Sequence, residues 1–385
     1  MVVRKEKEIK VIYAVTILLF AAFLAVPIIR LLGESFVLDT GWGMENYTAV
    51  LTGKGFAEAF GNSIIISLTS AVISTVLAFF LAYSIQYTNL GAKYKKLIRL
   101  LAVLPMLLPT ITYGFAIIYS FGKQGLLTKL IGTQLFDIYG FGGLLFGYVI
   151  YTLPISFLLI LNTMGYIDKK FMVVSRVMGD NSITTFFQTV FRPLLGTLAA
   201  SIVQCFFLCF TDYGIPASVG GKYEVVATVL YNEMLGSIPD FQQGAVVAML
   251  MLVPSIISIV LLRYLERYNI RYNKISAIEL QKNSLRDWFC GIVSGIILLI
   301  LVSIFLVIFV VPFVEEWPYQ TSFTLEHLQA VLNDNSLTMV YRNSIFVAAD
   351  SSAGIAHHLW CGAGNGTKQH ETPLERHHQQ HCPHH

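Results

Sequence analysis

Charged side chains are scarce in this sequence. Asp, Glu, Lys and Arg make up only 13% of its 385 residues, while 55% of the residues are apolar. A soluble domain typically carries about 25% charged residues. The formal net charge is only +3, so the overall charge gives no support for nucleic-acid binding. The composition therefore excludes an ordinary soluble domain, and we expect no nucleic-acid partner.

Catalytic and cofactor-binding motifs are also missing. The sequence has no paired carboxylates, no nucleophile–histidine constellation, no HExxH and no P-loop. Two of its five cysteines, Cys205 and Cys209, lie four residues apart in an apolar run and read as small apolar fillers. Three Gly-Lys pairs lack the GxxxxGK[ST] spacing of a nucleotide site, at Gly53-Lys54, Gly122-Lys123 and Gly221-Lys222. We expect a protein that is not an enzyme and holds no cofactor or metal.

Long apolar runs are what the sequence does contain. They come in blocks of about 20 residues, the length that crosses a hydrocarbon core of roughly 30 Å. Lipid offers no partners to backbone N–H and C=O groups, so each block must be helical. A signal peptide is the alternative for the first block, but its apolar core is long and no small-residue cleavage site follows. The predicted spans are Val11–Leu32, Ser63–Ile85, Leu100–Ser120, Gly143–Leu161, Leu194–Phe210, Gln243–Leu265 and Phe289–Phe313, with an eighth beginning at Ile345.

Cations gather in alternate loops and predict the orientation of the spans. They lie at the N-terminus, after the second span, after the fourth span and in the linker after the sixth span. The remaining loops hold few cations and many acids. By the positive-inside rule, the N-terminus and the loop at residues 166–193 are cytoplasmic. Although the net charge is small, the cations and acids are therefore predicted to lie on opposite sides of the membrane.

An internal repeat indicates how the spans are organised. The segment MENYTAVL at 44–51 resembles LEHLQAVL at 325–332. In the same ungapped register, Asn62-Ser63-Ile64 falls on Asn343-Ser344-Ile345. Each copy follows a span and an outer acidic segment, and the copies are six spans apart, so this is a parallel repeat. We infer a plan with one complete six-helix unit and the start of a second.

The second unit stops soon after it begins. Its apolar run from Ile345 to Ala349 gives way to a tail that holds eight of the nine histidines. A His/Cys metal site that includes Cys361 and Cys382 is the alternative reading, but the ligands lack the regular spacing of zinc motifs. We expect residues 350–385 to be a disordered, out-of-frame or foreign tail, which would make the chain a C-terminally truncated one.

Prolines within the spans indicate broken helices. Pro105, Pro109 and Pro154 should each interrupt helical hydrogen bonding inside the membrane. Two interpretations stay open, a packing kink or a bent pore lining. Asp212, at the outer end of the fifth span, is a candidate helix-end or gate residue. The candidate path-lining residues are Pro109, Thr110, Thr112, Tyr113 and Asp212.

The loop at residues 166–193 is polar and helix-prone, with a central glycine. The pattern predicts a helix over Lys169–Met178, a break at Gly179 and an Asx-type start to a second short helix over Ser182–Phe191. Pro193 precedes the next span. An amphipathic element lying on the membrane surface is the simpler alternative.

This loop resembles the EAA motif of binding-protein-dependent ABC transporter permeases, the MetI-like, type I fold. The motif has E-A-A, three residues, a glycine and then a proline. Its glycine matches Gly179, and its proline matches Pro193 with one additional residue. The E-A-A positions are Val173, Val174 and Ser175, so the glutamate is absent. Asp180 follows the glycine. The two-repeat plan is similar to the fused permeases for ferric iron, thiamine or phosphonates, and the run at 210–254 most resembles the iron and 2-aminoethylphosphonate branch.

The resemblance implies a fold, a function and partners. It implies an all-α polytopic membrane bundle in a bacterial plasma membrane that forms the path of a small solute such as ferric iron or a phosphonate. An extracytoplasmic solute-binding protein would deliver the solute. A separate cytoplasmic ATPase subunit would hydrolyse ATP and seat the loop. An ion-coupled secondary transporter is the rival class, but such a protein would usually carry mid-membrane charges, and no predicted span has one.

The predicted organisation has five parts. Residues 1–57 hold the first span and an outer segment, and 58–265 the MetI-like domain. Residues 266–288 form a cytoplasmic linker, 289–349 the incomplete second repeat and 350–385 the tail.

Overall fold

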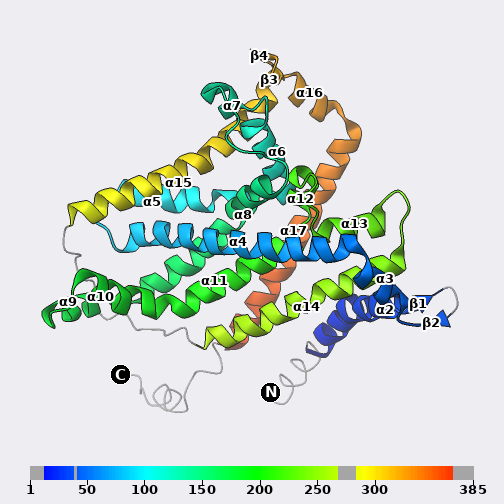
Figure 1. The fold of residues 1–385 in the computed structure, drawn as a ribbon, viewed down its shortest axis with the longest axis horizontal. Coiled ribbons are helices and arrows are strands. Elements are labelled where there is room, and N and C mark those ends of the chain that lie inside the picture. Colours follow the sequence, from blue (N-terminus) through cyan, green and yellow to red (C-terminus); the bar gives the residue numbers. More distant parts are fainter. Residues whose placement is uncertain (1–12, 39–40, 268–282, 367–385) are drawn as a thin grey trace, which may run out of the picture. The chain divides into compact units, whose positions relative to one another are not determined.

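A computed structural model describes residues 13–38, 41–267 and 283–366. The described chain is almost entirely helical, with two short β-hairpins, so the predicted all-α membrane bundle is confirmed (Figure 1). Residues Met1–Ile308 form one compact unit and Phe309–His385 another. Six described helices are long and apolar enough to cross a membrane: Tyr13–Glu34, Gly55–Gln86, Phe141–Tyr166, Ser182–Thr211, Phe241–Leu265 and Ser284–Phe313.

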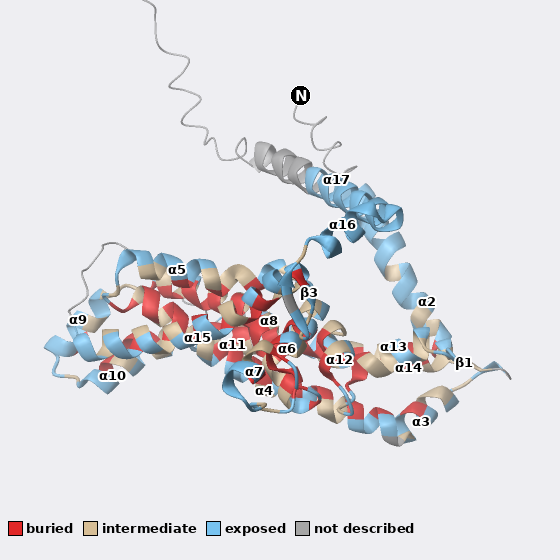
Figure 2. Ribbon diagram, turned by 90° about the horizontal axis from the view of Figure 1, so that it is seen from above, coloured by how far each residue is buried: buried red, intermediate tan, exposed pale blue. Residues whose placement is uncertain are grey.

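Three of these helices form the core of the first unit. They are α4 (Lys54–Gln86), α8 (Phe141–Tyr166) and α11 (Arg192–Thr211), which pack against one another. Small residues on their facing sides, such as Ser70 and Ser156, are buried and let the backbones approach closely. Buried residues concentrate on these helices (Figure 2). The remaining elements of the unit are arranged around this core.

The predicted third span is not one helix. It consists of α5 (Ala92–Val103), η2 (Leu104–Leu107), α6 (Thr110–Phe121) and α7 (Leu126–Ile131), with a 110° bend between its two halves. Pro109 caps α6, and Leu108 before it is extended, as the residue before proline prefers. The predicted break at Pro105 and Pro109 is therefore confirmed, and the predicted span Leu100–Ser120 corresponds to a bent helix pair, which is either one broken span or a re-entrant loop.

Pro154 does not break its helix, contrary to the prediction of a broken helix there. It lies inside α8, which continues from Phe141 to Tyr166. Pro254 similarly lies within α14 (Phe241–Glu266). One proline removes a single helical hydrogen bond, and a helix packed inside a bundle tolerates that loss. The prediction of a helix break at Pro154 is wrong because α8 is held on several sides by its neighbours.

Shorter elements complete the first unit. A hairpin of β1 (Val37–Leu38) and β2 (Gly41–Trp42) follows α2 (Val26–Glu34), and the first helix contains a π turn, η1 (Ala21–Ala25). A second cluster of buried residues joins α3, the start of α4, α11, α13 and α14. The other bounds are α3 Glu45–Thr52, α9 Lys170–Val177, α10 Ser182–Phe186, η3 Phe187–Phe191, α12 Gly214–Val219, α13 Val226–Leu235 and α15 Ser284–Val310.

The second unit repeats the start of the first. It contains η4 (Val311–Phe313), the antiparallel pair β3 (Val314–Glu316) and β4 (Gln320–Phe323), α16 (Glu326–Asn333) and α17 (Asn335–Gly366). In the register of the sequence repeat, both ends of α16 fall on the ends of α3, and the start of α17 falls on the start of α4. In each copy the second helical residue, Asn46 or His327, hydrogen-bonds carbonyls of the preceding hairpin segment. The repeat inferred from sequence thus has a structural counterpart.

The predicted disorder from residue 350 is wrong as far as Gly366. The helix α17 continues through this stretch, and Ile345 lies inside it. A helix once nucleated adds one hydrogen bond per residue, and no proline intervenes before Pro373. Among the described residues, α17 does not qualify as a candidate span. Residues 367–385, with Cys382, lie outside the described residues.

Candidate functional site

The loop at 166–193 forms two short helices joined by a tight turn. Helix α9 ends at Val177 and α10 begins at Ser182. Gly179 between them has a φ of +90°, a backbone conformation that favours glycine. The Asn181 side chain accepts a hydrogen bond from the Thr184 amide at 2.8 Å, which caps α10. The helix–break–helix predicted from sequence, with its Asx-type start, is confirmed.

Polar side chains on the inner side hold the turn closed. The Ser175 hydroxyl donates to Asp180 Oδ2 at 2.6 Å and lies 3.0 Å from Thr185 Oγ1. The Asp180 amide donates to the Ser175 carbonyl at 3.1 Å. Ser175 and Thr185 are buried. This cluster joins α9 to the start of α10. The motif resemblance had marked Ser175 and Asp180 but not Thr185.

Apolar side chains cover the outer side of the same loop. Val177 is 82% exposed, Met178 78% and Ile183 70%. Val173 and Val174 are half-exposed. A hollow of about 380 Å³ beside them is lined by Phe171, Val174, Ser175, Met178, Asp180, Gln188, Thr189 and Pro193. Several exposed apolar residues close in sequence, with a hollow beside them, are typical of a protein docking surface. We call Val177, Met178 and Ile183 the coupling surface, for the role that is proposed for it under Proposed function; exposed apolar residues of this kind have no sequence signal of their own.

The second short helix continues without a gap into the fifth span. Residues Ser182–Thr211 form one 30-residue helix that includes the π turn η3. Pro193 lies in the first turn of α11, directly after the wider π turn. The helix therefore contains the predicted span Leu194–Phe210 and begins twelve residues before it. Ile183 of the coupling surface therefore lies on the same continuous helix as the span, while Val177 and Met178 lie just before it, across the Gly179 turn.

The start of the loop is fastened to the end of α4. The Lys169 ammonium donates to the Gln86 carbonyl at 2.6 Å and lies 5.5 Å from the centre of the Tyr87 ring. The ends of α4 and α8 and the starts of α5 and α15 lie near α9 and α10 at one end of the first unit (Figure 1). The loops that carry the cations after the second and fourth spans are thus at one end of the unit.

The candidate path-lining residues fall into two groups. Pro109 is exposed, Thr110 and Thr112 are partly buried, and Tyr113 is fully buried with its hydroxyl donating to the Pro105 carbonyl. Asp212 follows α11, and its carboxylate accepts a hydrogen bond from the Ile215 amide at 3.0 Å. Burial raises the pKa of Asp212, and hydrogen bonds from the Ile215 amide and the Thr110 hydroxyl oppose that rise. Thr110 thus lies close to Asp212, whereas Tyr113 lies in the core.

Glycines allow α12 to lie directly against α6 and α8. A Cβ atom built at Gly214 would overlap Thr110, and one built at Gly114 would overlap the Ser218 side chain. A Cβ at Gly147 would lie 2.8 Å from the Ile215 side chain. The short helix α12, which follows Asp212, is therefore wedged between the broken span and α8.

Replacing Gly114 with alanine should destabilise this junction by about 1–3 kcal/mol because the added methyl group overpacks it. Thermal unfolding of the purified protein in detergent would show a lowered transition temperature. The double variant Gly114→Ala/Ser218→Gly should recover most of the loss, since the second change removes the side chain that the methyl group meets. An unchanged transition temperature for Gly114→Ala, or no recovery in the double variant, would contradict this account of the junction.

A chain of hydrogen bonds crosses the core of the bundle. Thr75 on α4 lies 3.1 Å from Ser201, whose hydroxyl donates to Ser156 at 2.7 Å. Ser156 lies 2.9 Å from the Cys205 sulfur. Interhelical hydrogen bonds of this kind stabilise membrane bundles. Cys205 is thus a polar member of the core as well as a small filler. Within the described residues, no group of three His, Cys, Asp or Glu side chains is placed to hold a metal ion.

Comparison with known proteins identifies the family of this bundle. The model of the binding-protein-dependent transport system inner membrane component matches residues 74–271, just over half of the chain. The chain is 24% identical over 265 residues to the putative ferric transport system permease protein FbpB 1 of Haemophilus influenzae, covering 68% of this chain and 42% of that protein. It is also 24% identical over 290 residues to the ferric transport system permease protein FbpB of Actinobacillus pleuropneumoniae, covering 74% and 42%.

The chain spans less than half the length of these two curated relatives. Among solved structures, it is similar to a chain of a bacterial alginate ABC transporter in complex with an alginate pentasaccharide-bound periplasmic protein. The TM-score is 0.56 at 14% identity, over 70% of this chain and 96% of that one. This likeness concerns the fold alone. The match of the family model over residues 74–271 shows that the chain belongs to the family of binding-protein-dependent transport system inner membrane components.

Proposed function

We propose that this chain is a permease subunit of an ATP-driven importer and that residues 166–193 couple it to a cytoplasmic ATPase. The observation that carries the proposal is the coupling surface itself. Exposed apolar side chains lie on a turn held by Ser175 and Asp180, and that turn is continuous with a spanning helix. Such a surface fits the groove of a protein partner, and rigid-body movement of the partner would move the span.

The orientation in this proposal follows the charges. The cation-bearing loops at 87–99 and 166–193 lie at one end of the first unit, together with the start of α15 (Figure 1). The positive-inside rule assigns that end and the N-terminus to the cytoplasm. The opposite end, with α12, α13 and the loop before α14, would then receive solute from an extracytoplasmic binding protein. Pro109, Thr110, Thr112 and Asp212 remain the proposed path-lining residues.

For the substrate we propose ferric iron or a chemically related small solute such as a phosphonate. The names of the two FbpB relatives support ferric iron. The chain matches only 42% of each of those relatives, so the substrate of the whole transporter is a proposal for this chain.

The ATPase partner can be tested directly. The chain would be reconstituted in nanodiscs and exposed to the ATP-binding subunit encoded beside its gene, with binding followed by biolayer interferometry. We expect saturable binding that is lost when the coupling surface is covered by an antibody fragment against residues 170–187. Absence of saturable binding, or binding that the fragment leaves unchanged, would contradict the coupling role. Uptake driven by an ion gradient without an ATPase would instead favour the secondary transporter.

A further inference from the structure

Helix α15 is attached to the first unit by polar contacts only near its start. The Asn89 amide donates to Asp287 Oδ1 at 3.1 Å, and the Tyr94 hydroxyl donates to the Gly291 carbonyl at 2.9 Å and lies 3.1 Å from Ser294 Oγ. Within the described part of α15, no residue after Ser294 hydrogen-bonds another element; Ser303 donates to Ile300 of the same helix. The helix is therefore fastened at one end, and its remaining length meets α4 and α8 through apolar side chains alone.

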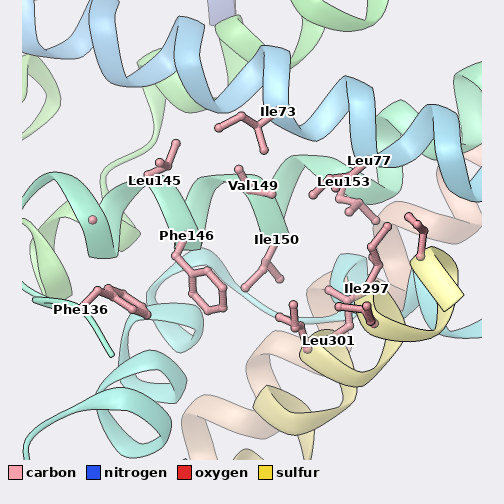
Figure 3. A pocket seen from close by; sticks show the side chains of 14 residues that line it. Ile73, Leu77, Phe136, Leu145, Phe146, Val149, Ile150, Leu153, Ile297 and Leu301 are labelled. Atoms are coloured by element: carbon pink, nitrogen blue, oxygen red, sulfur yellow. The ribbon is translucent and has the colours of Figure 1, made fainter. Parts of the chain in front are cut away.

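A groove of about 560 Å³ opens beside that apolar length (Figure 3). Its walls come from α4, α8 and α15, with Phe136 and Gly142 at the end nearest the start of α8. All of its lining residues are apolar; they include Ile73, Leu77, Phe146, Ile150, Ile297 and Leu301. Side chains from all three helices point toward the same space (Figure 3).

This space is too large and too apolar to be a packing defect or a water site. Protein interiors have few voids larger than a water molecule, and empty volume destabilises the surrounding structure in proportion to its size. Water would find no hydrogen-bond partner on these walls. In a bilayer, the groove must therefore be filled by something apolar.

The dimensions of the groove indicate which apolar group fills it. Its lining on α8 extends from Gly142 to Leu153, a rise of about 17 Å. That is close to the depth of one leaflet, half of a hydrocarbon core of roughly 30 Å. A helix with its side chains is about 10–12 Å across, whereas an extended hydrocarbon chain is far thinner and fits a narrow groove of this length.

We propose that the groove between α4, α8 and α15 binds one acyl chain of a phospholipid. All three helices qualify as membrane spans, so acyl chains surround the groove. The bound chain takes the place of protein side chains along the part of α15 that has no polar attachment. On the orientation proposed above, the chain belongs to the outer leaflet, with its headgroup near Phe136 and Gly142. The proposal depends on the membrane bundle and not on the transported solute.

Retained lipid can be mapped by photocrosslinking. The full chain would be loaded with phosphatidylethanolamine that carries a diazirine in one acyl chain, washed in detergent to remove weakly held lipid, irradiated and digested. We expect crosslinks at Phe146, Ile150 and Ile297 and none at Leu299. Leu299 lies on α15, as Ile297 does, but it is 72% exposed and does not line the groove. Equal labelling at Leu299, or no labelling in the groove, would overturn the proposal.

A filling variant gives a second measurement. Val149 points toward the groove (Figure 3), and Val149→Trp should occupy the space with protein. Native mass spectrometry should then show loss of the retained phospholipid, whereas Leu299→Trp, the matched control on the outer face, should keep it. Retention by a folded Val149→Trp protein would overturn the proposal. If that variant does not fold, the crosslinks in the unmodified chain still decide the question.

Discussion

Replacing Gly179 with valine is expected to abolish coupling between the chain and the proposed ATPase partner while leaving membrane insertion intact. The residue has a φ of +90°, and a β-branched side chain in this region costs about 1–3 kcal/mol. At about 2 kcal/mol, the population of the closed turn falls about thirtyfold. The strain would come from the backbone alone, because a Cβ at Gly179 would meet nothing within 4 Å. ATPase binding and ATP-driven uptake in proteoliposomes measure the effect.

Asparagine at the same position is the matched control. It tolerates positive φ better than other non-glycine residues, and the open space accommodates its side chain. Gly179→Asn should therefore keep most of the ATPase binding that Gly179→Val loses. Membrane extraction and size-exclusion profiles should be the same for both variants. Normal coupling by Gly179→Val would rule out a tight turn as the coupling element.

An aspartate at Met178 is expected to weaken ATPase binding by about 2 kcal/mol or more, roughly thirtyfold, because central apolar residues dominate protein interfaces. Met178 is 78% exposed in the free chain, so the substitution should leave the thermal stability of the bundle unchanged. The separation of a large binding loss from an unchanged unfolding temperature distinguishes a docking residue from a core residue. Titration of the ATPase against nanodisc-embedded chain measures the binding.

Ile238→Asp is the control for that substitution. Ile238 is 90% exposed and lies between α13 and α14, at the other end of the first unit. It matches Met178 in exposure and apolar character but lies far from the coupling surface. Its substitution should not change ATPase binding. Equal losses in both variants would indicate a general effect of added charge and would contradict a localised docking surface.

The features that depend on local chemistry were predictable from the sequence. Apolar blocks predict spans because lipid leaves the backbone no other partner. The ungapped register of the repeat predicted the correspondence of α3 with α16. Gly179 and Asn181 predicted the turn because few residues suit a positive φ or a helix cap.

The features that depend on tertiary packing were not predictable. Pro109 predicts a helix break, but the size of the bend, 110°, depends on tertiary packing such as the close contact of α12 with α6. Pro154 gives the same sequence signal as Pro109, yet α8 continues through it without a break. The contact of Ser175 with Thr185 forms only after the turn closes. The groove beside α15 depends on the angle at which that helix leaves its attachment at Asp287, and no local pattern encodes that angle.

The continuous helix from Ser182 to Thr211 has a consequence for how far a movement reaches. Thirty residues span about 45 Å, so the helix is a lever with the coupling surface at one end and the Asp212 turn just beyond the other. A tilt of about 10° displaces the far end by about 8 Å over that length. The π turn at Phe187–Phe191 lies close to the Ser182 end of this helix. A modest rotation imposed on α10 would therefore displace the Asp212 end of the helix by several ångströms.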